Sequence, residues 1–294
     1  MAELSPYALR LALYLVLMLL FGRMLFVRPG LPRGVSLALA LIAVAVVVTD
    51  AITRLSGVLG IAPADIDPAA AHWFLTGTPV GKAGLLRTVA MLAMLPLLAF
   101  ATPLQGLRRV VLLALSGMAL ASLSWNGHAA AGDGFGGTLR LLAGIVHLLA
   151  AGAWVGAIAA ILQLALRPQG LRLRERTYEL WRAAHSFALP GTVIVALLAM
   201  TGTYTYVDLG GSVQTLTGTA HGRWLLLKLA LVVGMLGLAA LHRWRLVPAL
   251  ATSIRDGWQP RPLRSLRHSL ACESVLAVLV LACVAVLGTL DPLA

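Results

Sequence analysis

A long apolar run at residues 139–166 constrains this chain more than any other feature, because it carries no charged side chain between Arg140 and Arg167. At a rise of about 1.5 Å per residue, a helix of this length crosses the hydrocarbon core of a bilayer, which is about 30 Å thick. We therefore predict a transmembrane helix at these residues.

Seven further apolar stretches accompany this run, at residues 9–27, 35–53, 81–101, 107–125, 184–207, 224–246 and 269–290. Hydrophobic residues make up 60% of the chain and charged residues 12%, and the mean hydropathy is +0.90. This composition excludes an ordinary soluble core with a charged shell. The prediction is an all-α polytopic membrane protein, in which residues 1–294 form one domain of about eight transmembrane helices. The first stretch is expected to be a retained span and not a cleaved signal peptide.

The Lys and Arg residues predict how these helices are oriented. Most of them flank alternate connections, those that follow the first, third, fifth and seventh stretches. Because cytoplasmic connections carry an excess of Lys and Arg, these four are predicted to be cytoplasmic and both termini periplasmic. The formal net charge of +12 is explained by this topology, so the expected partner is membrane lipid and not nucleic acid.

His147 is the ionisable side chain inside the 139–166 run, roughly 10 Å from its start. At that depth an imidazole needs a hydrogen-bond partner or a metal ion. Trp154 follows two turns later on the same helical face, and Gly152 and Gly156 form a Gly-x-x-x-Gly pair that lets another backbone come close. His147 is therefore the first candidate functional residue, and a plain hydrogen bond to a neighbouring helix is the alternative.

With the predicted orientation, the seven histidines form two layers, a periplasmic layer of His72, His128, His147 and His221 and a cytoplasmic layer of His185, His242 and His268. Imidazole binds copper and zinc well, and a short connection brings His128 near His147, so the periplasmic layer is the candidate metal site. Met200, at a similar predicted depth, would add a soft ligand suited to Cu(I). The alternatives are interfacial histidines at helix ends and a methionine that fills the core.

A second candidate metal group lies near the cytoplasmic start of the last span. His268 and Cys272 are four residues apart on one helical face, and Glu273 follows directly. These three residues are predicted as a possible exit site for a metal ion. The alternative is a capped and ion-paired helix start.

Two features of the first half of the chain also lead to predictions. Asp50, inside the second span, is expected to pair with Lys82 or Arg87 at the start of the third. Residues 69–75 are predicted to form a short interfacial helix with Trp73 and Phe74 at headgroup depth.

Several motifs resemble those of one known family. They are Gly127-His128-Ala129, HLLAAGAWVG at residues 147–156, Thr201-Gly202, GRWLLLK at residues 222–228 and RWRLVP at residues 243–248. On these motifs the chain resembles the CopD copper-resistance proteins of the bacterial inner membrane. The resemblance implies that copper, as Cu(I) or Cu(II), is taken from a periplasmic protein of the CopC type and passed into the cytoplasm. His128 and His147 would capture the ion, together with His72, His221 or Met200.

Two other functions fit the same residues. A membrane electron-transfer protein would hold one haem b in each histidine layer, although most of these histidines are at helix ends. A copper chaperone or assembly factor would hold the ion at the periplasmic face and transport nothing. The sequence has no Walker loop, Gly-x-Ser-x-Gly, His-Glu-x-x-His or Cys-x-x-Cys, so we expect neither ATP-driven pumping nor an enzyme of the common hydrolase classes.

Overall fold

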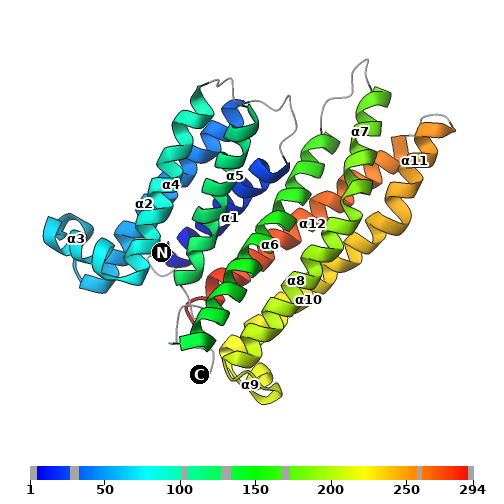
Figure 1. Cartoon of the computed structure of the whole chain (residues 1–294). Helices are drawn as coiled ribbons and strands as arrows, with labels where there is room; N and C mark the ends of the chain where they lie inside the picture. The colour runs from blue at the N-terminus through cyan, green and yellow to red at the C-terminus, as the bar shows by residue number, and fades with distance from the viewer. Residues whose placement is uncertain are drawn as a thin grey trace.

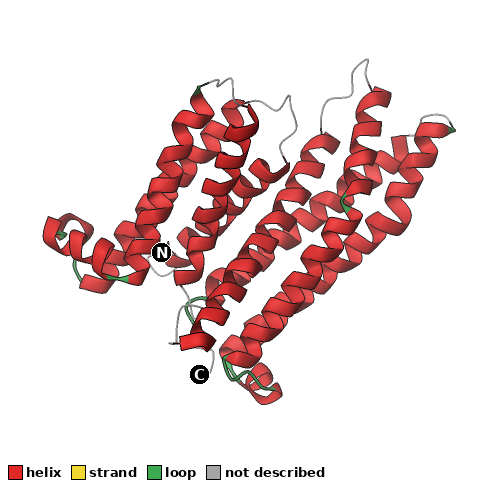
Figure 2. Ribbon diagram, viewed as in Figure 1, coloured by secondary structure: helices red, strands yellow, loops and turns green. Residues whose placement is uncertain are grey.

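The computed structural model describes residues 5–26, 33–100, 105–126, 134–166, 173–256 and 260–290. Within these ranges nearly every residue is helical and none forms a strand (Figure 2). Eight of the described helices are long and apolar enough to cross a membrane, and they coincide with the eight apolar stretches. The prediction of an all-α polytopic membrane protein is therefore confirmed.

The first half of the chain supplies four spans. Its elements are α1 (Ser5–Phe26), α2 (Arg33–Leu59), η2 (Pro63–Asp65), α3 (Pro68–Gly77), α4 (Pro79–Ala99), α5 (Gln105–Ala121) and η3 (Ser122–Asn126). The 3₁₀ turn η3 continues the span begun by α5, while η2 and α3 connect α2 to α4 at one end of the bundle (Figure 1).

The second half supplies the other four spans. Its elements are α6 (Gly134–Leu166), α7 (Leu173–Ser186), α8 (Ala188–Asp208), α9 (Val213–Gly218), α10 (Ala220–Leu241), η5 (His242–Leu246), α11 (Val247–Arg255) and α12 (Pro260–Leu287). Helices α3 and α9 lie at one end of the bundle, here called the α9 end, and α7 and α11 lie at the other, the α11 end (Figure 1).

Helix α6 packs against α1 through glycine residues. Gly22 and Gly156 are in such close backbone contact that a Cβ atom on either would overlap the other. A Cβ atom on Gly152 would likewise collide with the side chain of Leu120. The close approach predicted at this glycine pair is confirmed, and the partner is α1. Because α1 also packs against α12, it joins the two halves of the bundle.

A buried ion cluster holds the first half together at the α9 end. Arg87 is 1% exposed, and it donates from Nε to Ser122 Oγ at 2.9 Å and from Nη1 to Asp50 at 3.5 Å. Arg54 donates to the same Asp50 oxygen at 2.8 Å. The predicted pairing of Asp50 with Arg87 is confirmed, whereas Lys82 is exposed. Such neutralisation is needed because an unpaired charge in a low-dielectric interior is costly.

The short helix α3 forms where the sequence predicts one. Pro68 begins it, and the Asp67 carboxylate caps it by accepting a hydrogen bond from the Ala70 N–H at 2.7 Å. Trp73 is 54% exposed, as a residue at headgroup depth would be. Phe74 is 4% exposed, so it packs against the protein, while the neighbouring Trp73 faces outward.

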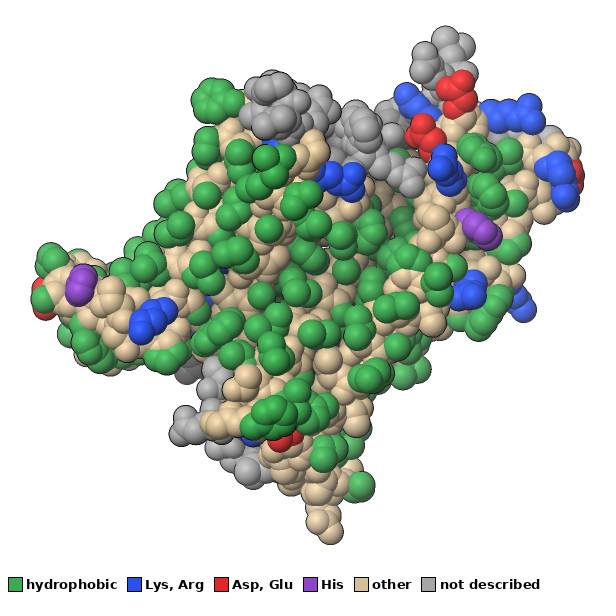
Figure 3. All heavy atoms as spheres, in the orientation of Figure 1, with side chains coloured by type: hydrophobic (Ala, Val, Ile, Leu, Met, Phe, Trp, Pro, Cys, Tyr) green, Lys and Arg blue, Asp and Glu red, His purple; other side chains and the backbone are tan. Residues whose placement is uncertain are grey.

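Apolar side chains cover the middle of the bundle, and charged side chains gather at the α11 end over α7 and α11 (Figure 3). The exposed arginines of this end include Arg174, Arg182, Arg243, Arg245 and Arg255. They belong to the connections that the charge pattern predicts to be cytoplasmic.

Candidate functional site

The His147 side chain points from α6 toward α8. Its Nδ1 atom lies 2.9 Å from Thr201 Oγ1, which is itself 2.6 Å from the Leu197 carbonyl oxygen. Because the hydroxyl donates its hydrogen to Leu197, the Thr201 oxygen accepts from His147, and Nδ1 carries the ring hydrogen. The lone pair of His147 is then on Nε2, and the Leu198 carbonyl oxygen is a second hydrogen-bond acceptor for the ring. A metal ion binds a histidine at the ring nitrogen that carries the lone pair.

The groups next to the His147 ring come from α8 and α10, and Lys228 of α10 connects them to Cys283 of α12. Gly202 on α8 lies against the ring, since a Cβ atom there would be 3.5 Å from Cε1 of the ring. Lys228 on α10 is partly buried and interacts electrostatically with His147 and with Cys283 on α12. Cys283 is 3% exposed. Polar side chains of α6, α8, α10 and α12 thus form one cluster, in which His147, Thr201 and Lys228 are partly buried.

A second polar cluster lies nearer the α11 end, around Glu273 halfway along α12. Glu273 is 3% exposed, and its Oε2 atom lies 3.4 Å from Nδ1 of His242 in η5. The indole N–H of Trp154 on α6 donates to the same carboxyl group, and Nε2 of His242 lies 2.7 Å from Ser269 Oγ. Since Trp154 follows His147 by two turns on one face of α6, the two clusters are in line, about 10 Å apart along that helix.

The pairing of His242 with Glu273 was not predicted from the sequence. Glu273 stood out there as an acidic residue inside an apolar span, but it was grouped with His268 and Cys272 of its own helix. In the structure, His268 and Cys272 lie exposed on one face of α12, whereas Glu273 points inward. The three predicted exit residues therefore divide between two faces, and the buried member pairs with a different histidine.

The other predicted ligands are spread over separate elements. His72 is exposed on α3, at the opposite edge of the molecule from α9 and α10 (Figure 1). His221 is partly buried at the start of α10, and His128 lies outside the described residues. Met200 is 69% exposed, so its side chain points away from the bundle interior. Among the described residues, no three His, Cys, Asp or Glu side chains are close enough to share a metal ion.

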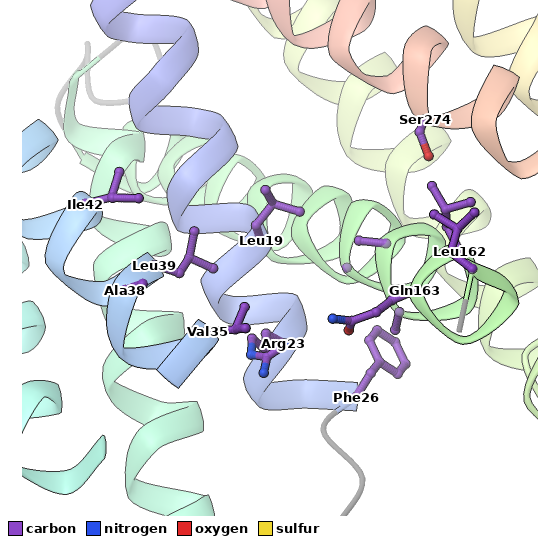
Figure 4. A pocket seen from close by; sticks show the side chains of 14 residues that line it. Leu19, Arg23, Phe26, Val35, Ala38, Leu39, Ile42, Leu162, Gln163 and Ser274 are labelled. Carbon is purple, nitrogen blue, oxygen red and sulfur yellow. The ribbon is translucent and has the colours of Figure 1, made fainter. Parts of the chain in front are cut away.

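A crevice of about 710 Å³ lies between α1, α2, α6 and α12 (Figure 4). Its lining is mainly apolar, with Arg23, Gln163 and Ser274 as polar members. Gly156 and Gln163 line it from α6, and at about 100° per residue they lie on the face opposite His147. The crevice is therefore separate from the two polar clusters.

Known proteins match the chain over nearly its whole length. The family described as Copper resistance protein D matches residues 181–287, and Copper resistance protein D-like, N-terminal domain, matches residues 1–138. The chain is 36% identical over 300 residues to Copper resistance protein D of Pseudomonas syringae pv. tomato, with 97% of this chain and 96% of that protein covered. The chain belongs to the copper resistance protein D family. No solved structure matches it.

Membership of the copper resistance protein D family confirms the resemblance seen in the sequence and gives the protein a copper-related membrane function. Together with the eight apolar helices, it makes the chain a multi-pass protein of the bacterial inner membrane.

The motifs that carried the resemblance to the copper resistance protein D family have structural roles. Thr201 is hydrogen-bonded to His147, and Gly202 lies against its ring. Gly222 packs against the last turn of α9, where a Cβ atom would overlap the Leu216 carbonyl group. In the RWRLVP motif the Val247 N–H bonds to the His242 carbonyl and closes the π turn η5, directly before Pro248, which has no N–H to donate.

Proposed function

We propose that this protein takes up copper from the periplasm into the cytoplasm through the second half of the bundle. The observation that carries the proposal is the His147–Thr201 hydrogen bond, which supports a ring with its hydrogen on Nδ1 and its lone pair on Nε2, where a metal ion could bind. Metal-binding histidines are commonly oriented by a hydrogen bond from their second nitrogen. An ionisable side chain is costly to bury in a membrane interior, so its presence there indicates a function.

The proposed direction depends on the orientation of the bundle. The arginines at the α11 end support a cytoplasmic position for that end, and so a periplasmic position for the α9 end. His147 is then reached from the periplasm. A cation that moves inward is favoured by the membrane potential, by about 2.3 kcal/mol per charge at 100 mV.

In this proposal His147 is the central ligand of a capture site near the periplasmic face. His221 lies in the first turn of α10, at the α9 end. His128, which lies outside the described residues, remains a candidate ligand on the sequence alone. His72, exposed on α3, and the outward-facing Met200 lie apart from His147. Copper would arrive as Cu(I) or Cu(II) from a periplasmic copper-binding protein of the CopC type. Repulsion from the nearby Lys228 would weaken binding and favour release of the ion.

Copper uptake into proteoliposomes that contain the full chain tests this proposal. His147→Ala should abolish uptake and remove one bound copper ion, whereas the exposed His185→Ala on α7 should change neither. Uptake by His147→Ala at the wild-type rate would contradict the proposed site.

The same preparation separates the alternative functions. Copper binding that depends on His147 without uptake would indicate a chaperone or assembly factor. Soret and alpha bands in a reduced-minus-oxidised absorbance spectrum would indicate a haem protein and overturn the proposal.

A further inference from the structure

We propose that His242 and Glu273 form a second copper site, inside the membrane, which receives the ion after His147. The proposal rests on the proposed function for the identity of the ion. It gives His242 the role of a metal ligand beside Glu273, a pairing that the sequence did not predict.

The distance between the two side chains fits a shared ion better than a direct hydrogen bond. His242 Nδ1 and Glu273 Oε2 are 3.4 Å apart, whereas a charge-assisted hydrogen bond between such groups is about 2.7–2.9 Å long. Two ligand atoms bound at about 2.1 Å to one ion with a tetrahedral angle lie about 3.4 Å apart. The two atoms are therefore already spaced as neighbouring ligands of one metal ion.

Both side chains are oriented by further hydrogen bonds. Ser269 Oγ lies 2.7 Å from His242 Nε2, and when Nε2 donates to it, the lone pair on Nδ1 faces the carboxyl group. Trp154 donates its indole N–H to Glu273 and so fixes the carboxyl group from α6. Ligands of metal sites are usually held in this way by outer partners. The pair thus has the two parts of a built site, the ligands and the groups that orient them.

Three other charged groups of the surrounding helices are engaged elsewhere. Lys228 of α10 interacts with His147 and Cys283, Arg267 of α12 donates to the Ala165 carbonyl at 2.6 Å, and Arg243 of η5 donates to Thr192 at 3.3 Å. A cation between His242 and Glu273 would therefore be balanced by the carboxylate itself.

Two protein ligands suit a transit site. A nitrogen and a carboxylate oxygen leave further positions for water, so an ion would be held weakly and would exchange readily. The site is about 10 Å beyond His147 along α6, toward the α11 end, and a copper ion would pass between them without leaving the bundle.

Cu(II) chloride titrated into the full chain in lipid nanodiscs, with electron paramagnetic resonance to count nitrogen ligands, tests the second site. We expect His147→Ala to retain one bound Cu(II) with one nitrogen ligand. Adding His242→Gln or Glu273→Gln to this variant should remove that ion, and adding His268→Gln or Cys272→Ser should not. Trp154→Phe, which keeps the aromatic packing, should weaken the site roughly 10-fold or more.

Retention of the ion in both the His242→Gln and Glu273→Gln variants would overturn the second site, and so would its loss in the His268→Gln or Cys272→Ser variant. Melting curves of each variant show whether a loss of copper reflects unfolding. If the His242→Gln and Glu273→Gln variants unfold, the copper affinity of Trp154→Phe is the remaining test, and an unchanged affinity would overturn the second site. The proposed function fails separately: wild-type uptake by His147→Ala would refute the capture site while the second site stands.

Discussion

Thr201→Val is the change that isolates the role of the hydrogen bond to His147. Valine has the shape of threonine but lacks the hydroxyl that accepts from Nδ1 at 2.9 Å. The ring then loses its orienting partner, and its hydrogen is no longer fixed on Nδ1. The side chain of His147 and its packing against Gly202 remain.

The magnitudes of the two expected effects differ. Side-chain hydrogen bonds between membrane helices contribute about 0.6 kcal/mol on average to the free energy of unfolding, and at most about 1.7 kcal/mol. Loss of an outer partner of a metal-binding histidine typically weakens metal binding about 10- to 100-fold, or roughly 1.4–2.7 kcal/mol. Thr201→Val should therefore reduce copper affinity more than it reduces stability.

Competition of the purified chain with a copper chelator measures the affinity, and unfolding in mixed micelles measures the stability. Thr201→Ser keeps a hydroxyl that can accept from Nδ1 and donate to Leu197, so it should retain wild-type affinity. Thr203→Val removes a hydroxyl from an exposed position of the same helix and serves as the matched control. Equal copper affinity in Thr201→Val and Thr203→Val would refute the reasoning that Thr201 prepares His147 for a metal ion.

Three further predictions concern packing and the ion cluster. Arg87→Met should lower the free energy of unfolding by about 3 kcal/mol, because Asp50 loses its buried partner. Arg54→Met, at the more exposed side of Asp50, should lower it by less than about 1 kcal/mol. Equal losses of stability in the two variants would contradict this difference. Gly156→Ala should lower the melting temperature by separating α1 from α6, and Gly84→Ala, whose Cβ atom would have no neighbour within 4 Å, should not. Gly202→Ala should keep the copper affinity, because its methyl group would be at ordinary contact distance from His147. Gly202→Leu should reduce the copper affinity. A chelator titration in which Gly202→Ala binds copper more weakly than Gly202→Leu would refute the contact.

Hydropathy predicted the membrane-spanning helices well because it is a local property. A helix that crosses a bilayer needs about 20 apolar residues in succession, and each of the eight spans has such a run in its own sequence. The contact between α6 and another helix at Gly152 and Gly156 was predictable for the same reason, since the small residues are on one face of one helix.

The sequence also predicted that His147 needs a hydrogen-bond partner or a metal ion, and that Asp50 pairs with Lys82 or Arg87. It did not predict that the partner of His147 is Thr201, which is 54 positions later in the chain. In the same way, Glu273 pairs with His242 and not with the nearer His268. These pairings depend on how α8 and η5 are rotated against their neighbours.

The chain by itself therefore determined that it is a helical membrane protein of the copper resistance protein D family with imidazole and carboxyl groups at membrane depth. Only the tertiary structure decided which of these groups face each other, which points inward and which points outward. The physical reason is that lipid and the protein interior are both apolar, so hydropathy cannot distinguish a helix face that packs against protein from one that faces lipid. Phe74, which is buried, and Met200, which is exposed, are residues whose surroundings the sequence could not decide for this reason.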